Sequence, residues 1–589
     1  MGLLQRAIET YDANKELVGI YREGHAPLAP IGHMLTSANL EITITANGDF
    51  QAARKVDKSE PKIIIPVTED SAGRSGTSAN EKPHPLCDQM KYLTAEENYY
   101  LPNLEAWANS EYSHPFLRAI DNYLKKGTIQ NDLQTSVDKL KEDDMVYWRV
   151  IGLPHEEPAC WKNLHLMCTF TEYYCGFVSK RGQVLCMIDG SETAKASQHP
   201  KGIVAVNGNA KLISANDTSG FSFRGRFDAD WQAATVGYIS SQKSHNALRW
   251  LASEQGVREP VGTRTYLCWS PKGIPIPRPT RSLRKTEAEP QIVPSDYRQS
   301  IAATLMSYRK DHQLTGNENV VLAAFDAATT GRLSLVYYNE FSISEFLDRM
   351  QSWDNYCCWN MGKYGIQAPN LRQLVLSAFG TQRGNFLEAD EAVERLQTQR
   401  LLACKINGGI FPADIKAALV QRSSTPLAFE ESSWRTIVKH ACAAIQKYNF
   451  DMKKGGDEMS WELNRPDRSF QFGRLLAIME RAEADYYHKT NETRQTNAIK
   501  FMSEYRQRPW TVFERINRQL HQAYLNRIEP WQSTRFEKLK DDVCAILRVF
   551  PENELNQPLS EAYLMGYELQ RNVFFAKTES KNQNENGGN

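Results

Sequence analysis

The 589-residue sequence carries 70 basic and 70 acidic side chains, so its formal net charge is zero. A neutral total excludes a uniformly cationic nucleic-acid binder, and any such binding requires positive charge that is segregated locally. No apolar run approaches the roughly 18 residues needed to span a bilayer, and Met1–Tyr11 lacks the apolar core of a signal peptide. The eleven scattered cysteines are typical of reduced thiols. These features predict a cytoplasmic protein.

Residues 1–255 mix strand and helix patterns. The β-rich runs Ile42–Thr45 and Ile63–Val67 are bounded by turn residues and predict strands. The polar stretch 69–85 cannot pack as a core element, so we expect it to be a mobile or functional loop. Apolar spacing and stop signals predict helices at 98–126, 131–142 and 240–256, and short β-rich runs predict strands at 184–188 and 210–214.

Residues 256–458 begin as an extended connector and then become helical. Six prolines lie between Pro271 and Pro294 and disfavour regular structure there. Asn319–Phe325 and Leu333–Tyr338 predict a pair of strands. The start Phe-Pro-Ala-Asp predicts an amphipathic helix over 411–422.

Residues 459–576 carry only helix patterns, which predicts a separate bundle. The expected helices are 468–487, 491–504, 510–528, 531–549 and 558–576. The polar tail 577–589 is expected to be disordered. The predicted fold class is α+β: a mixed region at 1–255, a connector, strand pair and helices at 256–458, and an all-α bundle at 459–576.

Motifs for catalysis are absent from the sequence. It contains no G-x-x-x-x-G-K-[ST], H-E-x-x-H or G-x-S-x-G pattern, so we expect no catalytic residues and no cofactor. The best set of metal-ligating side chains is His155, Cys160, His165 and Cys168, followed by Cys175 and Cys186. Its spacings do not match a zinc ribbon, which favours buried free thiols over a metal site.

Positive charge is concentrated between Pro260 and Thr286, a segment without any acidic residue. Its cations are Arg264, Lys272, Arg278, Arg281, Arg284 and Lys285. Interleaved prolines keep such a segment extended, which suits a track for phosphates. A solvated linker explains the same pattern equally well.

Two helical stretches offer further candidate contacts. On the helix around 240–251, Gln242, Asn246 and Arg249 share a face and Lys243 lies beside it. Such side chains reach base edges and phosphates, although a polar helix face is usually only solvated. Residues 489–527 interleave basic side chains with Tyr505, Trp510, Phe513 and Tyr524, which fits a single-strand groove or a helix with its aromatic rings turned inward.

A resemblance to a known family covers nearly the whole chain. The matching stretches are SAGRSGTSANEKPHPLCDQMKYL (71–93), HPKGI (199–203), AKLISANDTSGFSFRGRF (210–227), GYISSQKSHNALRWL (237–251), FDAATTGRLSLVYYNEF (325–341), LLACKINGGIFPADIKAALVQRS (401–423), FGRLLAIMERAE (472–483) and YLMGYELQRNVFF (563–575). In this order they resemble the large subunit of the type I-C CRISPR Cascade, a complex that uses a guide RNA to find invading DNA.

The resemblance implies a non-catalytic, nucleic-acid-handling subunit. Guide–target pairing reads the sequence, while the protein reads a short flanking motif, the PAM. The large subunit is expected to open the duplex at the PAM, to support the displaced strand and to recruit a helicase–nuclease for antiviral defence. Its implied partners are the 5′ handle of the guide RNA, the target DNA and the handle-binding and backbone subunits.

We expect three groups of residues to contact DNA. The loop of residues 71–80 would read the PAM through Arg74, Ser75, Gly76, Thr77, Ser78 and Asn80, because its glycines allow a close approach to a groove. Strand separation would use Lys201, Lys211, Asn216, Arg224 and Arg226, with Gln242, Lys243, Asn246, Arg249 and the basic connector. The displaced strand would follow Lys489, Arg494, Lys500, Arg506, Arg508, Arg515 and Arg518 of the bundle.

The gene is also expected to encode a shorter product that starts near Met459. The peptide Lys454–Met459 permits codons that read as a strong ribosome-binding sequence at a normal distance from Met459. The resemblance implies the same, because complexes of this type are expected to recruit free small subunits made from inside the large-subunit gene. The alternative is that Gly455 and Gly456 are only a hinge, and Met452 is a weaker rival start.

Two other functions compete with this interpretation. A nuclease, metal-dependent or acting on the guide RNA, would need a metal cluster or a His/Lys pair, and only His199 with Lys201 and Lys243 with His245 offer the spacing of such a pair. It would cleave nucleic acid with Mg²⁺ or in buffer alone. A pure protein scaffold of the complex would show no salt-dependent affinity for DNA.

Overall fold

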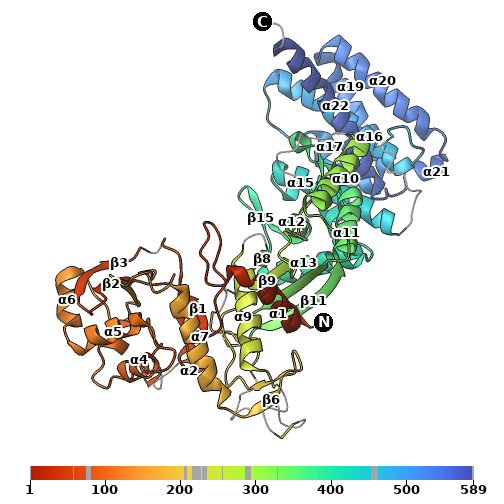
Figure 1. Cartoon of the computed structure of the whole chain (residues 1–589). Helices are drawn as coiled ribbons and strands as arrows, with labels where there is room; N and C mark the ends of the chain where they lie inside the picture. The colour runs from red at the N-terminus through yellow and green to blue at the C-terminus, as the bar shows by residue number, and fades with distance from the viewer. Residues whose placement is uncertain are drawn as a thin grey trace. The chain divides into compact units, whose positions relative to one another are not determined.

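The computed structural model describes most of the chain, coloured by residue number in Figure 1. The described residues are 2–57, 59–74, 81–204, 208–214, 227–228, 235–254, 257–284, 293–327, 329, 331–452 and 462–586, with side chains up to 574. They form two compact units: unit 1 contains Met1–Ile276 and Asn319–Phe341, and unit 2 contains Pro277–Glu318 and Ser342–Asn589. Small sheets in the first part and helices in the second confirm the α+β class.

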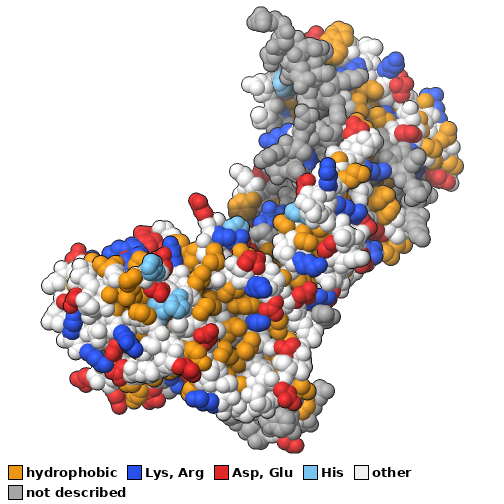
Figure 2. All heavy atoms as spheres, viewed as in Figure 1, with side chains coloured by type: hydrophobic (Ala, Val, Ile, Leu, Met, Phe, Trp, Pro, Cys, Tyr) orange, Lys and Arg blue, Asp and Glu red, His pale blue; other side chains and the backbone are white. Residues whose placement is uncertain are grey.

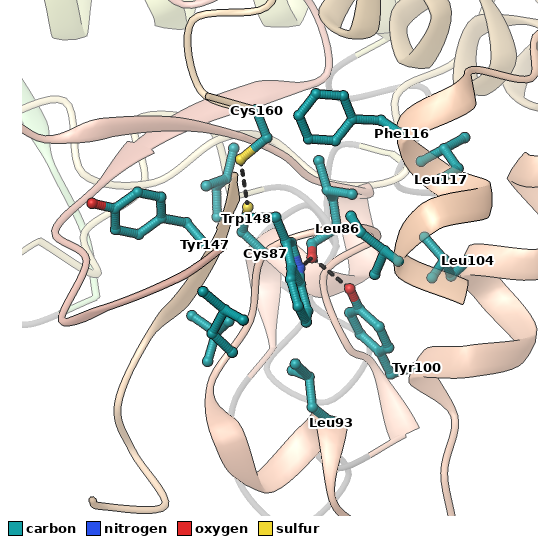
Figure 3. Packing of buried hydrophobic residues seen from close by; sticks show 14 of the residues in the cluster. Leu86, Cys87, Leu93, Tyr100, Leu104, Phe116, Leu117, Tyr147, Trp148 and Cys160 are labelled. Atoms are coloured by element: carbon teal, nitrogen blue, oxygen red, sulfur yellow. Dashed lines mark hydrogen bonds between the residues drawn. The ribbon is translucent and has the colours of Figure 1, made fainter. Parts of the chain in front are cut away.

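The first sheet of unit 1 has the strand order β3-β2-β5. Strand β2 (Leu40–Thr45), which the sequence predicted, pairs antiparallel with β3 (Phe50–Lys55) and parallel with β5 (Val146–Ile151). Against it packs a core in which the Trp148 indole and the Tyr100 hydroxyl both donate to the Leu86 carbonyl, as Figure 3 shows. Two polar groups of the core thereby share one acceptor at full burial.

Helices α4 to α7 contribute side chains to this core, and the bounds of α4 to α6 differ from the sequence prediction. Instead of one helix over 98–126, there are α4 (Tyr100–Ala108) and α5 (Pro115–Lys125). The reason is local: Pro115 occupies the first turn of α5, and the His114 imidazole accepts the Phe116 N–H as its cap. Helix α6 (Ile129–Ser136) is shorter than predicted, and α7 spans Leu164–Ser179.

The second sheet of unit 1 has the order β11-β10-β9-β8. The predicted strand pair is confirmed as β10 (Asn319–Asp326) and β11 (Ser334–Ser342), and the sheet continues through β9 (Arg264–Trp269) and β8 (Arg258–Val261). A separate core joins these strands to α1 and α9. Residues 210–214 are not a strand, because Lys211 makes only single bridges to Lys201 and Arg332.

The remaining elements of unit 1 are short, except α1 and α9. They are α1 (Leu3–Ala13), η1 (Lys15–Leu17), β1 (His33–Thr36), β4 (Ile63–Pro66), α2 (Glu69–Gly73), α3 (Met90–Leu93), β6 (Gln183–Leu185), β7 (Glu192–Ala194) and α9 (Tyr238–Ser253). Strands β1 and β4 pair antiparallel, which confirms the strand predicted at 63–67.

Unit 2 is mostly helical. Its first part holds α10 (Pro294–Asp311), α11 (Ile343–Tyr356), β12 (Trp359–Asn360), η3 (Gly362–Tyr364), β13 (Ile366–Gln367), α12 (Leu371–Phe379), β14 (Thr381–Arg383), β15 (Phe386–Glu388), α13 (Glu391–Asn407), α14 (Ala413–Ser423), η4 (Pro426–Ala428) and α15 (Glu431–Asp451). Its second part holds α16 (Arg468–Thr490), α17 (Asn497–Lys500), α18 (Met502–Gln507), α19 (Pro509–Ala523), η5 (Leu525–Arg527), α20 (Pro530–Leu547), α21 (Glu552–Leu555) and α22 (Ala562–Asn586).

The helices from α16 onward do not stand apart from those before them. Lys416 of α14 forms an ion pair with Glu561, and Ser424 shares a hydrogen bond with the Tyr563 hydroxyl. Helix α22 also packs against α15. These helices belong to the same compact unit, and α22 ends at Asn586, whereas the division at 458/459 and the disordered tail stay predictions. None of the described helices is long and apolar enough to cross a membrane.

Candidate nucleic-acid interface

Helix α9 contributes polar side chains to the interior of unit 1. The Asn246 amide donates to the carbonyls of Ala29 (3.2 Å) and Pro30 (2.9 Å), and Gln242 accepts the Gly32 N–H at 3.4 Å. Both side chains are buried. They hold the 29–32 segment against α9, and so their position differs from the exposed face that the sequence suggested.

Two cations of α9 have different surroundings. Lys243 is partly exposed and forms an ion pair with Asp12 at 2.6 Å. The Arg249 guanidinium donates to the Lys201 carbonyl and, at 3.3 Å, to the Asn246 side-chain oxygen. Burial lowers the pKa of Arg249 to about 10. Arg249 is therefore a cation held in the interior by neutral acceptors.

Arg249, Lys201, Lys211 and Arg74 form what we call the basic cluster. Burial lowers the pKa of Lys201, and the positive charges of Lys211, Arg74 and Arg249 lower it further. Lys201 and Lys211 are bridged through their backbones, and the Lys211 ammonium donates to the Gln198 side chain at 3.2 Å. Among the described residues, only Arg74 of these four has a carboxylate partner. The cluster thus concentrates positive charge that the described side chains leave uncompensated.

Residues 71–74 are the described part of the expected PAM loop, and the first three of them are helical, because α2 extends to Gly73 and Arg74 follows it. The Arg74 guanidinium binds both oxygens of buried Asp88, at 2.6 and 2.7 Å, and lies over the Tyr92 ring. This bidentate ion pair makes Arg74 a structural anchor of the loop, and base reading by its side chain would have to break it. Ser75, Gly76, Thr77, Ser78 and Asn80 lie outside the described residues, as do Asn216, Arg224 and Arg226.

The basic segment 260–286 does not form one continuous arm. Arg264 begins β9 and pairs with Asp326 of β10 at 2.9 Å, so the sheet neutralises it. Lys272 is exposed beyond β9, whereas Arg278, Arg281 and Arg284 belong to unit 2. There Ser282 and Leu283 donate to buried Asp354, and Lys405 donates to the Arg281 carbonyl, which fixes the connector. Lys285 lies outside the described residues.

The basic residues of the C-terminal helices fall into two groups. Lys489, Arg494 and Arg515 are paired with Glu529, Glu492 and Glu504, and Arg506 donates to Gln421. Lys500, Arg508 and Arg518 are exposed, and among the described residues they have no carboxylate partner. Tyr505, Phe513 and Tyr524 are buried. Of the two alternatives for these aromatic residues, the structure supports rings turned inward.

Comparison with known proteins decides the family. Residues 8–575, nearly the whole chain, match the model of a family described as CRISPR-associated protein (Cas_Csd1). The chain belongs to the Cas_Csd1 family. No curated protein matches this Cas_Csd1 chain.

The side chains that the fold of this Cas_Csd1 protein brings together are not the set that the sequence suggested as metal ligands. Cys160 lies in the core, with its sulfur 3.6 Å from that of Cys87. His165 instead approaches Glu156 (2.9 Å), whose other oxygen lies 3.3 Å from Nε2 of His114. His114 Nδ1 accepts a backbone N–H, so the neutral ring carries its proton on Nε2, and a metal would have to displace that proton. Only His165 is hydrogen-bonded to Glu156, because Nε2 of His114 lies near the carboxylate without forming a hydrogen bond.

The two histidines of the pairs considered for nuclease chemistry lie beside each other in the interior of unit 1. The His199 and His245 rings stack at 5.9 Å, and their nitrogens bond to the Ser241 hydroxyl and carbonyl respectively. Burial lowers the pKa of His199 to about 4 and that of His245 to about 3.

Sequence reasoning missed Lys62 and Arg258 of the Cas_Csd1 chain, which lie in one cavity with Lys201 and Arg249. No local motif marks them, because they meet only through the fold.

Proposed function

We propose that this Cas_Csd1 protein is the non-catalytic large subunit of an RNA-guided DNA surveillance complex. In this role it recognises the PAM in double-stranded DNA, helps to open the duplex, stabilises the displaced strand and recruits a helicase–nuclease. Its partners are the guide RNA, the handle-binding and backbone subunits and the target DNA. The observation that carries the proposal is the basic cluster of unit 1, in a chain of a CRISPR-associated family.

The physical argument concerns the charge of the cluster. Burying cations beside one another is unfavourable unless an anion approaches them. On the face drawn in Figure 2, acidic and basic side chains lie intermixed. Lys201 and Lys211 differ from this pattern, because they have no carboxylate partner among the described residues. A phosphate backbone supplies the missing charge. The expected PAM loop continues directly from Arg74, so phosphate docking at the cluster would bring the duplex to that loop.

Removing the two lysines tests this proposal. For the double variant Lys201→Ala and Lys211→Ala, assembled with guide RNA and partner subunits, we expect weaker binding to PAM duplexes. The slope of log affinity against log salt should fall by about 1.8 units, since each lost phosphate contact contributes roughly 0.9. The measurement is a binding titration at several salt concentrations, on duplexes with and without the PAM.

A matched control uses Lys15→Ala with Lys180→Ala, two exposed lysines elsewhere in unit 1. The control should keep the wild-type slope. Equal slopes for wild type, control and test variant, with all three folded, would assign the cluster to protein stability and would refute its role in docking DNA.

We further propose that a free small subunit begins near Met459, in the segment 453–461 outside the described residues. The product would contain α16 to α22, including the exposed cations Lys500, Arg508 and Arg518. Intact-mass analysis of the purified complex is expected to show a fragment that starts within a few residues of Met459. Silent recoding of codons 454–458 should remove it. A complex that lacks the fragment, and is unchanged by recoding, would rule out the internal start.

A further inference from the structure

A cavity of about 630 Å³ lies in unit 1, and we call it the α9 pocket. It is bounded by the C-terminal half of α9, the 25–35 segment, residues 201–204 with Gly208, and the start of β8. A volume of this size falls in the range of sites that hold one small organic ligand, roughly 300 to 1,000 Å³. The pocket therefore has room for one unit of a polymer and excludes a duplex.

The walls of the α9 pocket are of two kinds. Apolar side chains, among them Pro27, Leu35 and Ile203, form much of the surface. Lys62, Lys201, Arg249 and Arg258 add positive charge, and no carboxylate is found among the described residues that line the pocket. A ligand that suits both kinds of wall carries a flat, weakly polar part and an anionic part.

The Arg249 guanidinium is oriented before any ligand arrives. Nε and Nη2 donate to the Lys201 carbonyl, and Nη1 donates to the Asn246 oxygen. Asn246 is itself fixed by its two bonds to Ala29 and Pro30. Three of the five N–H groups of Arg249 are used in this way, so the remaining ones are available to an acceptor in the pocket. Such a preorganised cation loses little side-chain entropy when it binds an anion.

The nearby acidic residue does not supply this anion. Glu254, which follows α9, accepts the Ala26 N–H at 2.9 Å and contacts the His25 ring nitrogen at 3.0 Å. Its carboxylate is therefore held at the 25–26 segment. Glu254 therefore does not form an ion pair with Arg249 or Lys201.

We propose that the α9 pocket takes a single unpaired nucleotide, with its base against the apolar walls and its phosphate on Lys201 and Arg249. The proposal rests on the proposed function, because an opened duplex or a guide RNA supplies such a nucleotide. Extruding a base from a stack is least costly when the strand is already single. The lining offers few fixed groups that could read a base edge, so we expect the pocket to accept any base at one strand position.

The test places a fluorescent base, 2-aminopurine, at successive positions of three strands in the assembled complex. One series labels the displaced DNA strand beside the PAM, a second labels the target strand, and a third labels the handle of the guide RNA. An extruded base is unstacked, and its fluorescence should rise at one position of one series. That series identifies the source of the nucleotide.

The variant Met34→Trp, at a lining residue of β1, fills the α9 pocket without removing a charge. It should abolish the position-specific signal and weaken binding of the labelled strand about 5- to 150-fold, the range expected when a bound base loses its contacts. Leu35→Trp, which fills the same space, is the second variant in case the first does not fold. Met187→Trp, at a residue that is 60% exposed, is the matched control and should keep the signal.

Failures of the two proposals are distinguishable. If no position in any series gives a signal that the filling variants remove, the pocket proposal is overturned, even when the salt dependence of Lys201 and Lys211 holds. If the salt dependence is absent but a signal remains that Met34→Trp removes, base binding in the pocket stands, whereas the phosphate contact of Lys201 and the docking role of the basic cluster are refuted.

Discussion

Glu480→Gln is expected to destabilise unit 2 by about 3–5 kcal/mol, the range for removing one partner of a buried ion pair. Glu480 is only 4% exposed. One of its carboxylate oxygens lies 2.6 Å from both Arg435 and Arg571, and the other accepts the Tyr567 hydroxyl. A neutral amide in this position would remove the shortest ion pair of two partly buried guanidinium groups. Arg435 would keep only exposed Glu431, and Arg571 only Glu568 at 3.8 Å.

Urea unfolding of the full chain measures this effect as a lower midpoint at an unchanged slope. Glu431→Gln is the matched control, because Glu431 pairs with the same Arg435 but its side chain is 73% exposed. Exposed ion pairs contribute about 0–1 kcal/mol, so the control should stay close to wild type. If both variants lose the same free energy of unfolding, the buried ion pairs of Glu480 stabilise the protein no more than the exposed pair does.

The same carboxylate predicts a pH dependence. Burial opposes the ionisation of Glu480, but Arg571 and Arg435 outweigh it and lower its pKa to about 2. Since this folded-state pKa lies below the unfolded value of about 4.3, the stabilisation is present above that value and is lost as the pH falls towards 2. Wild type should therefore lose more stability than Glu480→Gln between about pH 5 and 2. Parallel pH profiles of the two proteins would contradict the assignment.

Local sequence patterns predicted many elements of the fold, because those elements depend on neighbours in the chain. The apolar run at 63–67 became β4, and the helix predicted at 468–487 became α16. The parallel pairing of β2 with β5 joins segments about 100 residues apart. No local pattern encodes that pairing, and so the sequence could not place β5 in the first sheet.

The candidate site was harder to predict for the same reason. Asn246 looks like a solvated or DNA-facing residue until the 29–30 carbonyls are placed against it. Arg264 looks like one charge of a basic arm, yet Asp326 from a distant strand neutralises it. A polar residue in sequence does not reveal whether its partner is water, nucleic acid or the protein itself.

Two glycines allow α16 and α22 to cross closely, a role that the sequence alone does not indicate. A β-carbon at Gly473 would lie 1.9 Å from the Tyr563 carbonyl oxygen, and one at Gly566 would lie 2.0 Å from that of Phe470. Both obstacles are backbone atoms of the facing helix, which cannot rotate away. The two helices therefore pack backbone against backbone at this point, in the part of the chain that the proposed small subunit would share.

Gly473→Ala and Gly566→Ala are each expected to destabilise unit 2 by at least about 1–3 kcal/mol, because overpacking forces the backbones apart. The sign is informative, since glycine to alanine inside a helix ordinarily stabilises by about 1 kcal/mol. Gly176→Ala in α7 supplies that comparison: its β-carbon would meet only the Tyr112 ring at 3.8 Å, an ordinary contact, so this variant should gain stability. Chemical denaturation of the three variants tests the contrast. If all three substitutions stabilise the protein, α16 and α22 cross at a greater distance than the structure shows. If Gly473→Ala and Gly566→Ala destabilise it while Gly176→Ala stabilises it, the two helices cross as closely as the structure shows.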